Sequence, residues 1–107
     1  MKGVVDVVNL TPIMIEGQPF TAVTVKLPKT NFMAVANEHG YIMCGALDVA
    51  LLNEKLKERG IVAGRAVGVR TIDQLLDAPL ESVTYAAEDL GIHAGMSGRA
   101  ALLKMVK

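Results

Sequence analysis

The strongest constraint on the fold is a change in the spacing of apolar residues near position 44. Before it, short apolar runs alternate with polar residues, as in residues 20–27. After it, Val49, Leu52 and Leu56 recur at helical spacing. Side chains alternate with period 2 in a strand and with period 3.6 in a helix. The sequence therefore predicts an α+β fold, in which an N-terminal antiparallel β-meander precedes a helix-rich C-terminal half with one further strand.

Turn residues separate the strands that we expect in the meander. Residues 16–19 and 38–40 contain glycine or proline, which adopt positive φ or fix φ and so favour turns. We also expect Pro12 to break the first apolar run. The expected strands are residues 4–10, 13–15, 20–27, 32–36 and 41–44.

The expected helices have characteristic ends. Gly60 favours the left-handed conformation that terminates a helix. Thr71 and Gln74 have the spacing of a capping box, and Pro79 suits the first turn of a helix. We expect helices at residues 48–59, in a short segment after Thr71, at residues 79–90 and from Ser97 onwards, with the further strand at residues 61–69.

Length and charge limit the possible partners. The 107 residues suffice for a single domain, residues 1–107, with residues 1–44 as its β-rich part and residues 45–107 as its helix-rich part. Eleven basic residues balance eleven acidic ones. This balance gives no electrostatic footprint for nucleic acid or an anionic membrane, and it leaves self-association easy. We expect further copies of the same chain as partners.

Cysteine usage and the apolar stretches favour the cytoplasm. Cys44 is the single cysteine, so it forms no internal disulfide and fits a reducing compartment. Asp6 and Asn9 interrupt the N-terminal apolar run, and we therefore expect no signal peptide. The longest apolar stretch, residues 41–52, is too short to cross a bilayer.

Glycines precede or accompany three expected helix starts, within residues 44–48, 64–71 and 91–99. Helix starts present unpaired amides, and glycines let a ligand approach the backbone, so such places bind small anions. The alternative is that each glycine serves only a cap, a turn or close packing.

Arginine guanidinium groups can fork onto a phosphate or a carboxylate. The arginines near these helix starts are Arg65, Arg70 and Arg99. The residues that we expect to bind a ligand are Gly45, Asp48, Arg70, Thr71, Gly95, Ser97, Gly98 and Arg99.

Cys44 supports a different hypothesis, an enzyme with a thiol nucleophile. A thiol beside a helix start gains reactivity, with His39 or His93 as its base and Asp48 as the group that orients the base. The alternative is a buried cysteine that packs as a small hydrophobe. One cysteine and two histidines show no metal-ligand spacing. We expect no metal site, and no cofactor is indicated.

Four segments carry a resemblance to a known family. They are PKTN at residues 28–31, GYIMCG at 40–45, GVRT at 68–71, and residues 91–102, which end in GMSGRAAL. Together they resemble the YunC-like family, a small bacterial and archaeal domain of unknown function. The resemblance spans essentially the whole chain. It implies an α+β fold whose β-rich N-terminal region mediates tetramer formation, and it implies no activity, substrate or cofactor. Ala100 stands where the family often has an acidic residue, which argues against a carboxylate role there.

Three functional hypotheses follow. The first is a cytoplasmic homo-oligomer that binds a small anion or metabolite at the glycine-led helix starts. The second is an enzyme that uses Cys44. The third is a structural or regulatory oligomer that binds a protein partner through an apolar patch. Residues 4–10 and 20–27 carry apolar residues on both faces, more than a short chain can bury alone, which favours assembly.

Overall fold

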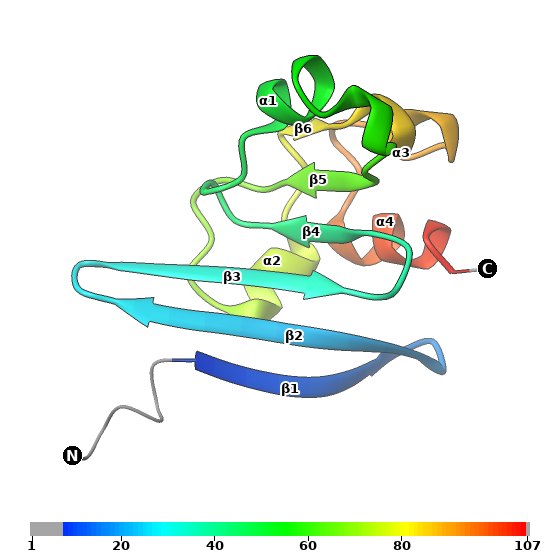
Figure 1. The fold of residues 1–107 in the computed structure, drawn as a ribbon. Helices are drawn as coiled ribbons and strands as arrows, with labels where there is room; N and C mark the ends of the chain where they lie inside the picture. The colour runs from blue at the N-terminus through cyan, green and yellow to red at the C-terminus, as the bar shows by residue number, and fades with distance from the viewer. Residues whose placement is uncertain (1–7, 107) are drawn as a thin grey trace.

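A computed structural model describes residues 8–106 (Figure 1). Six strands form one sheet in the order β1-β2-β3-β4-β5-β6. The strands are β1 (Val8–Ile15), β2 (Gln18–Leu27), β3 (Thr30–Ala36), β4 (Tyr41–Met43), β5 (Ala63–Arg65) and β6 (Ser82–Val83). The helices are α1 (Val49–Glu54), the 3₁₀ helix η2 (Lys57–Arg59), α2 (Ile72–Asp77), α3 (Tyr85–Asp89) and α4 (Gly98–Lys104).

The sheet is mixed. Strands β1 to β4 pair antiparallel with their chain neighbours, as the N-terminal meander predicts. Strand β5 pairs parallel to β4, and α1 and η2 lie in the connection between the two strands. A parallel pair requires such a crossover because the chain must return to the same end of the sheet. Strand β6 pairs antiparallel with β5 and forms the other edge of the sheet.

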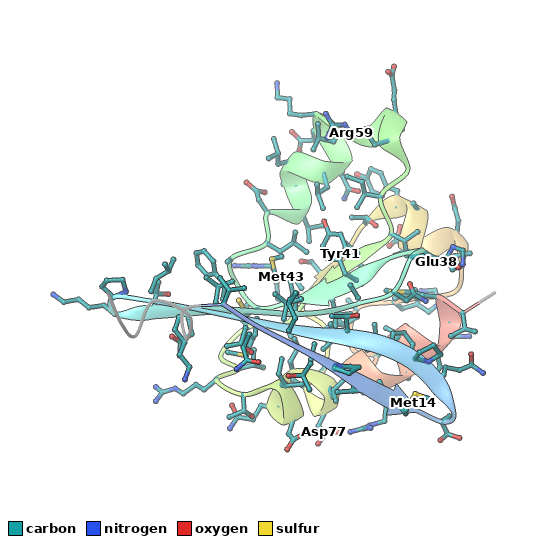
Figure 2. All side chains as sticks on the ribbon, turned by 60° about the horizontal axis from the view of Figure 1, so that its bottom comes forward. Met14, Glu38, Tyr41, Met43, Arg59 and Asp77 are labelled. Carbon is teal, nitrogen blue, oxygen red and sulfur yellow. The ribbon has the colours of Figure 1, made fainter. Side chains whose placement is uncertain are left out.

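Helices α2 and α4 cover one face of the sheet. Figure 2 shows α2, with Asp77, on the side of the sheet opposite to α1. Side chains directly opposite in paired strands share a face, and this face carries Phe20, Met33, Val35 and Ile42, all buried. They pack with apolar residues of the two helices, which include Leu75, Leu76, Ala101 and Leu102.

Helix α1 covers only part of the other face. Leu47, Val49 and Leu52 form a second, smaller core with Ala63 of β5. Tyr41 of β4 packs against it. Over β1, β2 and β3 this face is turned toward the viewer in Figure 1, and no helix of residues 8–106 covers it.

The first strand corrects one sequence expectation. Pro12 does not break the apolar run, since β1 continues through it and Pro12 pairs with Thr21 of β2. Proline has no backbone N–H to donate to a neighbouring strand. An edge strand tolerates it because it has a neighbouring strand on one side only. The part of the expected strand 4–10 that precedes Val8 lies outside the described residues.

The α+β class is confirmed, and several helix bounds are corrected. The expected helix 48–59 divides into α1 and η2, which Gly60 ends with φ 60°, and the expected strand 61–69 shortens to β5. The helix expected over residues 79–90 is wrong over its first half. That segment forms β6 and then α3, because Leu80 N donates to Met96 O at 2.8 Å and Glu81 N to Arg65 O at 2.7 Å. Backbone carbonyls from distant parts of the chain thus accept the amide hydrogen bonds that a helix would have formed within itself.

Two expected helix starts are confirmed. Thr71 caps α2, and its hydroxyl accepts from Gln74 N at 3.0 Å. The Gln74 side chain bonds the amide of Arg70 at 2.7 Å rather than that of Thr71, so the box is shifted by one residue. Ser97 caps α4. Within residues 8–106, no helix has the length and apolar character needed to cross a membrane.

Thr84 joins the two halves of the helix-rich part. Its buried hydroxyl donates to Ile61 O at 2.6 Å and accepts from Ala63 N at 3.1 Å and Ala87 N at 3.3 Å. One hydroxyl therefore holds the entry to β5 and the start of α3 together.

We expect Thr84→Val to lower the free energy of unfolding by about 2 kcal/mol, because it leaves the buried Ala63 amide without its partner. Urea unfolding at one fixed protein concentration measures this loss. Thr84→Ser keeps the hydroxyl and serves as the matched control. A loss in Thr84→Ser but not in Thr84→Val would show that the methyl group, and not the hydrogen bonds, matters.

Candidate functional site

The structure places the expected ligand residues in separate locations. Gly45 and Asp48 line the largest hollow, about 630 Å³, beside α1 and β6. Arg70 lines another hollow, about 520 Å³, beside the β2–β3 hairpin. Gly95, Ser97, Gly98 and Arg99, before and within the first turn of α4, line neither of these hollows. The three glycine-led helix starts therefore do not meet in one cleft.

Each of these helix starts is capped by its own side chain. Asp48 Oδ1 accepts from Leu51 N at 3.0 Å, Thr71 Oγ1 from Gln74 N at 3.0 Å, and Ser97 Oγ from Ala100 N at 3.1 Å. These side chains take amides that an anion would otherwise bind. The helices behind them have six, six and seven residues. The positions are thus explained by capping.

Gly98 is required by close packing. A Cβ atom there would lie 2.5 Å from Leu75 O and 2.6 Å from Ile42 Cδ1. Gly45 is different, since the nearest atom to its Cβ would be Val67 Cγ1 at 3.7 Å. Gly95 has φ 92°, which a side chain rarely adopts. Close packing therefore explains Gly98, and a positive φ explains Gly95. Neither reason applies to Gly45.

Two of the three candidate arginines are paired with carboxylates. Arg65 Nη1 lies 2.9 Å from Glu81 Oε1, and its Nε and Nη2 donate to Gly45 O. Arg99 Nη2 lies 3.2 Å from Asp77 Oδ1. Arg70 has no ion pair within residues 8–106. Of the three, only Arg70 keeps its guanidinium available in the described part of the chain.

The largest hollow has the wrong charge for an anion. Asp48, Glu54 and Glu81 line it together with one cation, Arg65, that is already paired. A hydrogen bond from the Ser82 hydroxyl, followed by the Arg65 guanidinium, lowers the pKa of the exposed Glu81 carboxyl. Glu81 therefore stays ionised, and the hollow carries excess negative charge.

Cys44 lies in the core. Its side chain is 6% exposed and packs in the larger apolar cluster. His39 precedes β4 and Cys44 follows it, so the rise of the strand keeps the two residues about 10 Å or more apart. His93 is exposed in the loop before α4, and Asp48 already caps α1.

Within residues 8–106, no cluster of three His, Cys, Asp or Glu residues could hold a metal ion.

The uncovered side of β1, β2 and β3 carries several exposed apolar side chains. We call it the open face. Leu10 and Met14 of β1 are 64% and 66% exposed there, and Phe32 of β3 is 39% exposed. The apolar residues of the open face are Val8, Leu10, Pro12, Met14, Val23, Val25, Leu27, Phe32 and Ala34, and Thr21 and Thr30 lie on the same side. None of these residues is charged, so the face suits an apolar contact.

Comparisons with known proteins agree with this fold. The protein-family model described as "Domain of unknown function (DUF1805)" matches residues 43–105. The uncharacterized protein YunC of Bacillus subtilis (strain 168) is 95% identical over 100 residues, which cover 94% of this chain and 99% of that protein. A crystal structure of a protein of unknown function from Thermoplasma acidophilum has a TM-score of 0.82 and 26% identity, covering 92% of this chain and 93% of that one.

We expect Gly98→Ala to destabilise the protein by about 1–3 kcal/mol, since backbone atoms must shift to admit the methyl group. The better helix propensity of alanine offsets only part of this loss. Gly45→Ala is the matched control, with an expected change within about 0.5 kcal/mol because its surroundings are open. Chemical denaturation of the two variants and the parent protein tests the comparison. A neutral Gly98→Ala variant would contradict the close packing.

We expect the Cys44 thiol to react slowly with an aromatic disulfide reagent in the folded protein and rapidly in denaturant, because burial excludes the reagent. The absorbance of the released thiolate measures both rates. A model cysteine peptide is the control. Native reaction as fast as the peptide would contradict this burial and would revive the nucleophile hypothesis.

Proposed function

This chain belongs to the DUF1805 family of unknown function, and from that premise we propose that it is the protomer of a homo-oligomer that assembles through the open face. The single observation that supports the proposal is the uncharged, exposed apolar side of β1, β2 and β3. Monomeric proteins rarely leave a large contiguous apolar patch in water, and such patches mark interaction sites.

The exposed side chains supply a driving force for association. Val8, Leu10 and Met14 are 53%, 64% and 66% exposed. Burying the exposed part of each contributes roughly 1–2 kcal/mol, and a contact between two copies counts every residue twice. Obligate interfaces are apolar in the same way, so the open face has the composition of an assembly surface.

A second copy fits this face better than an unrelated protein. A two-fold contact is self-complementary, and a surface without charge creates no repulsion when it meets itself. The balanced charge of the whole chain, eleven basic against eleven acidic residues, adds no long-range repulsion.

A tetramer needs a second contact, and the edge of β1 offers one. Among the described residues, β1 pairs with β2 alone, so its outer backbone groups have no strand beside them. Exposed strand edges readily pair with another chain. The free thiol of Cys44 favours a reducing compartment, and we place the oligomer in the cytoplasm.

We expect the parent protein to have a mass near four times 11.4 kDa in solution, and the double variant Leu10→Glu/Phe32→Glu to dissociate to smaller species. Two buried carboxylates without partners strongly oppose association. Size-exclusion chromatography with light scattering measures the mass, and circular dichroism verifies that the variant is folded.

Thr11→Glu is the matched control, because Thr11 is exposed on the opposite side of β1. It should keep the mass of the parent protein. A monomeric parent protein, or a double variant of unchanged mass, would refute assembly through the open face. A complex of one copy with a different protein would favour the partner-binding alternative instead.

A further inference from the structure

Two segments far apart in the sequence line an open hollow of about 520 Å³. One is the end of the β2–β3 hairpin, and the other is the loop that joins β5 to α2. In Figure 1 the hairpin projects past this loop at the left of the view. The residues that line the hollow are Leu27, Lys29, Thr30, Asn31, Met33, Val69 and Arg70.

The charge of this lining has one sign. Within residues 8–106, the ionisable residues that line it are Lys29 and Arg70, and both are basic. Neither forms an ion pair within residues 8–106, where the three ion pairs present involve His39, Arg65 and Arg99. Two cations that line one hollow without a carboxylate partner attract an anion that enters it.

The backbone on both sides holds these cations in place. Gln74 Oε1 accepts a hydrogen bond from the Arg70 amide at 2.7 Å, and the neighbouring Val69 packs against the core. Lys29 stands in the two-residue turn between Leu27 and Thr30 with φ 65°. Glycine or asparagine usually occupies such a position.

The donors of the hollow match a tetrahedral oxyanion. A guanidinium binds two oxygens side by side, and an ammonium group acts as a point charge. Thr30 adds a hydroxyl and Asn31 an amide. The volume lies within the range of small-molecule pockets and exceeds what a phosphate ion alone would fill. Met33 and Val69 provide an apolar wall for the remainder of a ligand.

We infer that the hollow between the β2–β3 hairpin and the β5–α2 loop binds a small phosphomonoester, with Arg70 and Lys29 as the anchors of its phosphate group. Arg70 directly precedes the Thr71 cap of α2, but the site uses its side chain and not the amides of the helix start. Leu27 and Thr30 of the hollow lie at the edge of the open face. Its ligand is an organic phosphate rather than a polymer, since the hollow is local and the net charge of the chain is zero.

Isothermal titration calorimetry at low salt tests the inference with glycerol 3-phosphate, inorganic phosphate and glycerol as probes. We expect the ester to bind more tightly than inorganic phosphate, and glycerol not to bind. Arg70→Gln and Lys29→Gly should each weaken binding of the ester about tenfold or more, as the loss of a charge-assisted contact predicts. Glycine accepts positive φ, so Lys29→Gly should fold normally.

Arg59→Gln is the matched control. Arg59 is exposed on η2, and Figure 2 shows it far from the sheet at the outer end of the molecule. It removes the same charge as Arg70→Gln and should leave affinity within about twofold. Equal weakening by Arg59→Gln, or no binding of either phosphate at millimolar concentration, would overturn the inference. Equal affinity for the ester and inorganic phosphate would overturn the assignment of an organic ligand.

Discussion

The close approach of α4 to β4 organises this molecule. Gly98 lies directly against Ile42, and any side chain at that position would strike Ile42 and the backbone of α2. The contact brings two helices onto the short central strands, where Ile42, Leu75 and Leu102 are fully buried. Because the helices are all short, they gather over this part of the sheet and leave the long strands β1 and β2 to protrude.

The protruding strands explain the two surface features of interest. On one side they carry an apolar, uncharged open face that α1 is too short to reach. Beside the tip of the β2–β3 hairpin, this hairpin and the loop before α2 line a hollow whose charged groups within residues 8–106 are both basic. The proposed assembly surface and the inferred ligand site both belong to this extension, and they share Leu27 and Thr30 at its tip.

Local patterns predicted much of the backbone. The alternation in residues 20–27 identified β2, and Ser97 and Thr71 marked the starts of α4 and α2. The helix expected over residues 79–90 failed because Leu80 and Val83 suit either a helix or a strand when both sides are buried. The backbone of that segment instead pairs with Arg65 and Met96, and such partners cannot be inferred from spacing.

The sequence by itself determined the α+β class, the meander, the caps and the surplus of apolar residues in its first strands, because each depends on residues close together in the chain. Only the tertiary structure decided which charges are paired. It joined Arg65 to Glu81 and Arg99 to Asp77, and it placed Arg70 and Lys29 in the lining of one hollow. Those pairings arise between segments many residues apart, where packing of the helices on the sheet, and not local propensity, sets the distance.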